Sequence, residues 1–501
     1  MTPPKVINHV RRGFYLDSVA LMRLSQKLSA LPDVESAALM IGSDSNKKVM
    51  EEALLLTDTG RGAGANDLIV AIRTQNNEAV DSILNEAEAL LDAPVIRAAE
   101  EGDWRPKTLD SALETLKEVN LALISVPGEF AAEEARKALR KNLHVMLFSD
   151  NVSVEDECAL KKEAQERGLF LLGPDCGTAI IGGVPLAFAN EVPAGNVGIV
   201  SASGTGLQEV SSLLTRGGMG ISHGIGVGGR DLSEAVGGLM TMMAFDALDE
   251  DPETKRIILI SKPPSQKIAG RILERASRSS KQISICFLGN SELKLPPNAK
   301  LTPTLMAAAE DALGAPLPLR KISQRLLSRS GDPGRRWIRG LFSGGTLCAE
   351  AQVVLQMAGE KVYSNAPIPG AEHLNGGQPE SHVLLDLGSD EYTVGRPHPM
   401  IDPSVRTKHF LSSMGEPGVA VVLLDVVIGY GSHEDPAEEI AAAVRNLENR
   451  KICVVASVCG TEGDPQKYSA QVEKLEKVGV LVASSAAQAA DLAFRISKGL
   501  T

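Results

Sequence analysis

The chain has little cysteine and no spacing typical of a metal site. Its 501 residues include six cysteines, none in a Cys-x-x-Cys pair, and eight histidines, none in a His-Glu-x-x-His pattern. We therefore expect neither a disulfide framework nor a bound metal. No apolar run reaches the roughly 18 residues of a membrane span, and the first residues lack the apolar core of a signal peptide. These absences favour a cytoplasmic protein without a membrane partner.

Acidic residues outnumber basic ones. The chain has 63 Asp and Glu against 51 Lys and Arg, a formal net charge of −12. This balance disfavours nucleic acid as a partner, and it means that a site for a small anionic substrate depends on local helix dipoles and a few basic side chains. The length predicts three or four domains.

Apolar runs alternate with amphipathic segments along most of the chain, a pattern typical of a multidomain α/β protein with parallel sheets. The first unit is the exception, because its order of strands and helices favours a small α+β sandwich. The predicted units are an α+β sandwich over 1–100, a Rossmann-like unit over 105–192, and two further α/β units over 193–320 and 335–501. Residues 316–335 have the composition of a linker.

Two segments share one design, an apolar strand followed by a Ser/Gly turn and an amphipathic helix. They span residues 197–209 and 338–350, and Gly359 is placed to end the second helix. Glycines let a ligand approach the backbone, and a helix N-terminus offers unpaired N–H groups to an anion. The candidate phosphate-binding residues are Ser201, Ser203, Gly204, Thr205, Gly206, Ser343, Gly344, Gly345 and Thr346. A Cβ at Gly204 or Gly345 is expected to occupy the space of the anion. A plain β-α turn is the alternative, and the lysine of a nucleotide-binding loop is absent.

The other candidates are polar residues in loops. They are Lys262, His398 and His433 as catalytic candidates, with Gly229, Arg230, Asp175 and Thr178 as substrate-binding candidates. The lysine and arginine could hold an anion, and the histidines could transfer a proton or orient a substrate. A solvated lysine and structurally hydrogen-bonded histidines are the alternatives.

Residues 121–265 resemble the α subunit of succinyl-CoA synthetase. The matching stretches are residues 173–177 (GPDCG), 198–205 (GIVSASGT), 226–229 (GVGG) and 250–254 (EDPET). In that family, helices from the α and β subunits point their N-termini at a phosphorylated histidine. Residues 342–348 (FSGGTLC) are similar to the β-subunit turn. The resemblance implies a CoA-binding-type Rossmann-like domain and two flavodoxin-like domains of the succinyl-CoA synthetase type.

Three departures separate the chain from that family. Residues 288–300 contain no histidine, Lys262 stands in the place of the glutamate that supports the phosphohistidine, and the Gly-x-x-Gly loop for CoA has no counterpart. An enzyme phosphorylated on histidine is therefore not expected, and CoA is not a firm cofactor.

The whole chain resembles the FdrA group, which includes a subunit of oxamate carbamoyltransferase. This resemblance implies a transferase subunit that acts with two other protein subunits and uses carbamoyl phosphate as substrate in nitrogen catabolism. Phosphate held by helix ends would suit that reaction, which needs no covalent intermediate. An ADP-forming acyl-CoA synthetase and a non-catalytic scaffold remain the alternatives.

Overall fold

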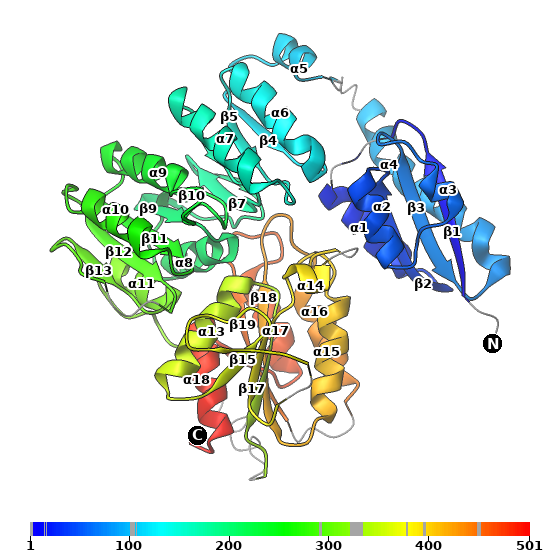
Figure 1. The fold of residues 1–501 in the computed structure, drawn as a ribbon. Coiled ribbons are helices and arrows are strands. Elements are labelled where there is room, and N and C mark those ends of the chain that lie inside the picture. The colour runs from blue at the N-terminus through cyan, green and yellow to red at the C-terminus, as the bar shows by residue number, and fades with distance from the viewer. Residues whose placement is uncertain are drawn as a thin grey trace.

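The computed structural model describes residues 4–500 except 15, 17, 101–105, 107, 290–292, 321–333, 377–378, 394–396 and 448–451. Most of the expected linker over 316–335 thus lies outside the described residues. The strands form four sheets, two of three strands and two of seven (Figure 1). The predicted multidomain α/β class, with an α+β unit at the N-terminus, is confirmed.

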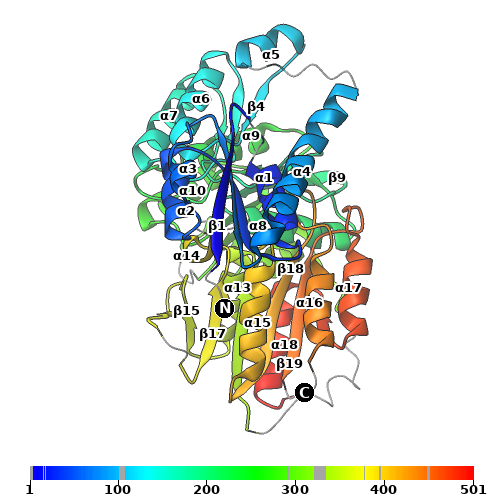
Figure 2. The same ribbon diagram turned by 90° about the vertical axis from the view of Figure 1, so that its right-hand side faces the viewer.

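The N-terminal unit is a three-stranded antiparallel sheet in the order β1-β3-β2. Its elements are β1 (Lys5–Arg11), α1 (Ser18–Ser29), β2 (Val34–Ile41), α2 (Asp44–Glu52), α3 (Asp58–Arg61), β3 (Leu68–Thr74), a 3-10 turn (Asn77–Ala79) and α4 (Val80–Glu100). The central strand β3 is almost wholly buried, because α1 and α4 contribute apolar side chains to one core and α2 contributes to another. Figure 2 shows this unit in front of the other sheets.

The second sheet is parallel, in the order β4-β5-β6. Its elements are α5 (Leu109–Thr115), β4 (Leu121–Ile124), α6 (Gly128–Arg140), β5 (His144–Leu147), α7 (Val154–Glu166) and β6 (Leu171–Leu172). The small residues of α6 are buried at every turn, so this helix packs closely against β5 and α7.

The third sheet has seven strands in the order β13-β12-β11-β9-β10-β7-β8. Its elements are β7 (Thr178–Ile181), β8 (Val184–Ala187), β9 (Ala194–Ser201), α8 (Gly204–Arg216), β10 (Ile221–Gly226), α9 (Leu239–Glu250), β11 (Arg256–Ser261), α10 (Gln266–Ala276), β12 (Gln282–Phe287), β13 (Ala299–Leu301) and α11 (Leu305–Leu313). The antiparallel hairpin β7–β8 pairs with β10, so residues before 193 extend this sheet.

The fourth sheet also has seven strands, all parallel, in the order β16-β15-β17-β14-β18-β19-β20. Its elements are β14 (Trp337–Phe342), α13 (Gly345–Met357), β15 (Val362–Ser364), β16 (Glu372–His373), β17 (His382–Asp386), α14 (Asp390–Thr393), α15 (Ser404–Gly415), β18 (Val419–Val427), α16 (Pro436–Arg445), β19 (Cys453–Cys459), α17 (Tyr468–Lys477), β20 (Leu481–Ala483) and α18 (Ala486–Ser497). Strand β18, in the interior of this sheet, is buried along its whole length, as expected for a parallel strand covered on both faces.

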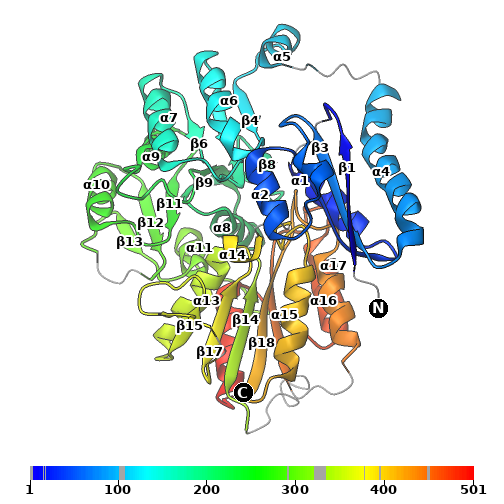
Figure 3. The same cartoon turned by 45° about the vertical axis from the view of Figure 1, so that its right-hand side comes forward.

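One apolar core joins the two seven-stranded sheets. Helices α8 and α11 from one sheet pack against α13 and α18 from the other, and Leu207 and Leu347 belong to the same buried cluster (Figure 3). Both leucines are fully buried, which agrees with the apolar helix faces predicted for them. The two lobes are therefore held together by a continuous core.

Within the described residues, no helix is long and apolar enough to cross a membrane.

Candidate functional site

The N-termini of α8 and α13 meet between the two lobes. Ser203, which precedes α8, and Thr346, in the first turn of α13, share a hydrogen bond between their hydroxyl groups. A Cβ atom on Gly344 would lie 3.0 Å from Cγ2 of Thr205. The two Ser/Gly turns that the sequence singles out, 143 residues apart, thus lie side by side.

The turn before α8 keeps two of its amides free for a ligand. Ser201 Oγ accepts a hydrogen bond from the Ser203 amide (3.1 Å) and donates one to the Ser203 carbonyl (2.6 Å), which fixes the turn. Ser203 Oγ in turn accepts from the Gly206 amide at 2.9 Å. Within the described residues, the amides of Gly204 and Thr205 have no acceptor. Helix α8 therefore presents two unpaired N–H groups and the positive end of its dipole.

The turn before α13 is held by a buried carboxylate, while the amides of Gly345 and Thr346, like those of Gly204 and Thr205 in α8, have no acceptor among the described residues. Asp425, at the buried end of β18, accepts hydrogen bonds from the amides of Ser343 and Gly344, both at 2.7 Å. Arg406 donates to Ser343 Oγ at 2.9 Å and to the Asp425 carbonyl at 2.7 Å. Burial raises the pKa of Asp425, whereas Arg406 and the two amides lower it. The amides of Ser343 and Gly344, expected to bind phosphate, are committed to this carboxylate.

The two glycines after these turns are needed because protein atoms lie against them. A Cβ on Gly204 would lie 2.9 Å from Thr178 Oγ1, and a Cβ on Gly345 would lie 2.5 Å from Asp386 Oδ2. The expectation that a side chain here would occupy the space of an anion is thus wrong. Thr178 itself is buried and donates to the Phe188 carbonyl at 2.6 Å, so its side chain is held in place against the turn of α8.

Lys262 is the basic side chain that the structure brings to the helix ends. It follows β11, a strand paired with β9, and it is exposed. Burial raises the pKa of Asp386, and the charge of Lys262 opposes that rise. Among the described residues, Lys262 forms no ion pair, and its side chain is exposed.

Arg230 is engaged in a structural network rather than free in its loop. Its Nε lies 2.9 Å from Glu157 Oε2, and Nη2 donates to the Val152 carbonyl at 2.8 Å. Glu157 and Asp231 both pair with the fully buried Lys161, at 2.9 and 2.8 Å, and Asp231 also accepts from the first amides of α9. This network joins α7 to α9.

The loop that contains Asp175 and the loop that contains Gly229 pack against one another. A Cβ on Gly228 would lie 2.6 Å from the Pro174 carbonyl oxygen, which brings the loop that contains Asp175 against the loop that contains Gly229. The Cβ position of Gly229 is 3.9 Å from the Ala202 carbonyl, next to the turn of α8. Asp175 adopts a left-handed backbone (φ 56°) and is exposed.

The two histidine candidates lie on neighbouring loops of the C-terminal lobe. His398 Nε2 would be 2.6 Å from a Cβ on Gly388, a glycine that also abuts the Ser343 carbonyl, so this ring lies beside the turn of α13. His398 Nδ1 accepts from the Met400 amide, and burial lowers the pKa of the ring to about 4, which makes it a weak base. His433 Nδ1 accepts from the Asp435 amide at 3.0 Å, a hydrogen bond that shapes its own loop.

Sequence reasoning missed three residues at these turns, namely Asp386, Asp425 and Arg406. Both aspartates lie at or near the carboxyl ends of buried parallel strands, where ligand-contacting side chains gather. Their position near the strand ends was a signal that sequence reasoning could have used to find them. Arg406 lies on α15, a helix that the sequence analysis did not identify, so no pattern indicated it.

A second pair of helix ends meets deeper in the interface. Glu350 of α13 accepts from the Met306 amide of α11 at 3.2 Å, and Glu209 of α8 accepts from the Ala486 amide of α18 at 3.1 Å. Each carboxylate thus caps a helix of the opposite lobe, and both are buried. Burial and then the charge of Glu209 raise the pKa of Glu350 to about 8.

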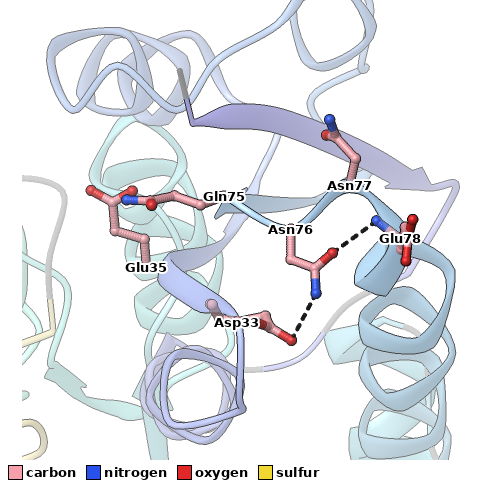
Figure 4. A pocket seen from close by; sticks show the side chains of 7 residues that line it. Asp33, Glu35, Gln75, Asn76, Asn77 and Glu78 are labelled. Carbon is pink, nitrogen blue, oxygen red and sulfur yellow. Dashed lines mark hydrogen bonds between the residues drawn. The ribbon is translucent and has the colours of Figure 1, made fainter. Parts of the chain in front are cut away.

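An open hollow on the N-terminal unit offers little to an anion (Figure 4). Asp33, Glu35 and Glu78 contribute carboxylates, and Asn76 donates to Asp33 Oδ2 at 3.2 Å. Because the remaining lining side chains are amides and one valine, a phosphate would meet negative charge there.

Comparison with known proteins identifies relatives over the whole chain. The uncharacterized protein YahF of Escherichia coli is 41% identical over 495 residues, which cover 95% of either protein. The chain belongs to the YahF family. Residues 341–496 match the CoA-ligase family, and residues 4–106 match a family described as AllF, heavy metal-associated domain.

Part of the YahF-family chain is also similar to a ligase subunit. The alpha 2 subunit of the ADP-forming succinate–CoA ligase of Archaeoglobus fulgidus is 29% identical over 202 residues, which cover 38% of this chain and 66% of that subunit. A dinucleotide-forming acetyl-coenzyme A synthetase of Ca. Korarchaeum cryptofilum is 18% identical, covers 77% of this chain and 86% of its own, and superimposes with a TM-score of 0.30. The chain is thus CoA-ligase-like in its C-terminal lobe and similar to succinyl-CoA synthetase α.

The donor atoms of the N-terminal unit do not fit a heavy metal. Residues 4–106 contain no cysteine, so no thiolate is available for a soft metal ion. His9, the histidine in this range, lies 2.7 Å from Glu88 Oε1, and Met50 is fully buried in the core. The match to a heavy metal-associated family therefore reflects the fold of this unit and not a site for a heavy metal.

Proposed function

We propose that this YahF-family chain binds the phosphate group of an acyl phosphate at the tip of α8 and catalyses acyl transfer of the CoA-ligase type. The observation that carries the proposal is the meeting of α8 and α13, where the amides of Gly204 and Thr205 are free and the charge of Lys262 acts on Asp386 beside the tip of α13. Amide donors to an anion contribute about 1.5–3 kcal/mol each, which suffices for a small anionic ligand. Similarity to ADP-forming ligases supports the reaction class.

The reaction proposed is the one between an acyl phosphate and CoA. The thiol of CoA forms a bond to the acyl carbon, the bond from that carbon to the phosphate oxygen breaks, and phosphate leaves with the electron pair. Residues 288–300 contain no histidine, so the chain would use an acyl phosphate formed elsewhere. The residues expected for a CoA loop are absent, so CoA binding is itself part of the test.

Phosphate binding and turnover test this proposal separately. Calorimetric titration with inorganic phosphate should give binding that Lys262→Ala weakens at least tenfold, while the matched control Lys267→Ala, an exposed lysine on α10, leaves it unchanged. Acetyl phosphate and CoA should yield acetyl-CoA and phosphate, detected by mass spectrometry. An intact chain that binds no phosphate would refute the proposal.

Carbamoyl transfer is the second candidate, and we propose it on a specific observation. Carbamoyl phosphate is an acyl phosphate that arrives already activated, which suits a chain without a histidine in residues 288–300. The FdrA resemblance adds a nitrogen acceptor such as oxamate and two partner subunits. Phosphorolysis of oxalurate with and without candidate partner subunits would distinguish this reaction from thiol acylation. A phosphorylated histidine found by mass spectrometry after treatment with ATP would instead indicate an ADP-forming ligase.

A further inference from the structure

A carboxylate at the end of β17 lies at the place where the two helices meet. Asp386 is 7% exposed, and its position is fixed because its amide donates to Asn365 Oδ1 at 2.9 Å. Asn365 Nδ2 donates back to the Asp386 carbonyl, also at 2.9 Å. The side chain accepts from the Gly388 amide through Oδ1 at 3.0 Å. A carboxylate held this firmly at the rim of a parallel sheet is placed for chemistry.

The second oxygen of this carboxylate is directed to the tip of α13. Oδ2 lies 2.5 Å from the Cβ position of Gly345, and within the described residues it accepts no hydrogen bond. The residue before Gly345 is Gly344, whose Cβ position lies 3.0 Å from Cγ2 of Thr205 in the first turn of α8. Oδ2 and the first turn of α8 therefore lie against neighbouring residues of the same turn. A phosphate on the free amides of α8 would therefore place its acyl carbon near a nine-tenths buried carboxylate.

We propose that Asp386 is the catalytic base that removes the proton from the nucleophile. This inference rests on the proposed function. The sulfur or nitrogen of the nucleophile forms a bond to the acyl carbon, and phosphate leaves with the electrons of the broken C–O bond. The proton of the nucleophile passes to Asp386 Oδ2, and release of that proton to solvent completes the cycle.

Three other acid–base groups of the C-terminal lobe are less suited to this role. His398 and His433 each use Nδ1 to accept a backbone amide, and Asp425 is occupied by two amides and Arg406. Asp386 keeps an oxygen free. Burial raises its pKa above that of an ordinary carboxyl, which makes it a stronger base, and Lys262 limits the rise.

Asp386→Asn tests the inference, with the exposed Asp491→Asn on α18 as the matched control. We expect Asp386→Asn to lower kcat about 100-fold or more, the usual contribution of a general base, with little change in KM. The acidic limb of the pH profile of kcat/KM should disappear. Asp386→Glu, which keeps the carboxylate, should retain that limb at reduced kcat. Unchanged kcat and an unchanged profile in Asp386→Asn would overturn the inference.

Anion affinity gives a readout that needs no turnover. Sulfate keeps its charge across the pH range, so its affinity for the wild-type protein should fall as pH rises and Asp386 becomes charged. Asp386→Asn should remove this dependence, whereas Asp491→Asn should keep it. A wild-type protein that binds sulfate with the same pH dependence as Asp386→Asn would refute a base facing the anion. Failure of wild type to bind sulfate or phosphate would instead refute the proposed function.

Discussion

Replacing Glu350 by glutamine should remove a large part of the pH dependence of stability. Glu350 is fully buried between the lobes, and its pKa of about 8 exceeds the ordinary 4.5. A group with a raised pKa in the folded protein binds its proton more tightly there than in the unfolded chain. Its contribution is therefore fully present below about pH 4.5 and is lost as pH rises through 8. A shift of about 3.5 pH units corresponds to roughly 5 kcal/mol.

The geometry explains why glutamine should be tolerated. Glu350 Oε1 accepts from the Met306 amide, and Oε2 is buried without a partner in the described residues, which suits a protonated carboxyl more than a charged one. Glutamine keeps the acceptor and carries no charge. Glu350→Gln should therefore match the wild type near pH 5 and exceed its stability at pH 8.

Urea unfolding between pH 5 and 9 measures this effect. The free energy of unfolding of the wild type should fall with pH more steeply than that of Glu350→Gln, by up to about 1.4 kcal/mol per pH unit between pH 5 and 8. Glu253→Gln, at an exposed site, should follow the wild type. Parallel curves for the wild type and Glu350→Gln would show that the carboxyl is charged in the folded protein and would refute the reasoning.

Three further changes test the packing around the site. Lys161→Met removes the ammonium group that pairs with two buried carboxylates. It should lower the free energy of unfolding by about 3–5 kcal/mol in urea titrations, and a loss below about 1 kcal/mol would contradict the network. Gly345→Ala brings a Cβ within 2.5 Å of a carboxylate oxygen and should lower the free energy of unfolding by about 1–3 kcal/mol, measured by thermal unfolding. The control Gly270→Ala, in open space on α10, should leave stability unchanged or raise it. Ser203→Ala removes the cap of α8 and should cost about 1 kcal/mol, and an unchanged melting temperature would argue against the cap.

Local patterns predicted the helices and strands that carry the turns. Helix α8 begins at Gly204 after a Ser203 cap, and α13 ends before Gly359, whose φ of 82° requires a residue without a side chain. These features depend on residues close in the sequence. The hairpin β7–β8 and helices α10 and α15 were not identified, because their short or weakly periodic segments are defined by partners elsewhere in the chain.

The site depends on contacts between residues far apart, and for that reason only part of it could be predicted. The meeting of Ser203 with Thr346 follows from two similar turns and a family resemblance. That Asp425 fills the second turn could not be read from the sequence, because the pairing of β14 with β18 brings the aspartate there.

The different filling of the two turns suggests different tasks for the two lobes. Near α13, Asp425 and Asp386 supply negative charge, so a dianion shared equally by both helix ends would be repelled there. At α8, the amides of Gly204 and Thr205 remain free and the side chains around the turn, Ser201 and Thr178, are neutral, so an anion is favoured on that side. The phosphate should therefore bind to the α8 lobe, and the α13 lobe should receive the proton of the nucleophile. The convergence of the two helix ends then brings together two unlike half-sites.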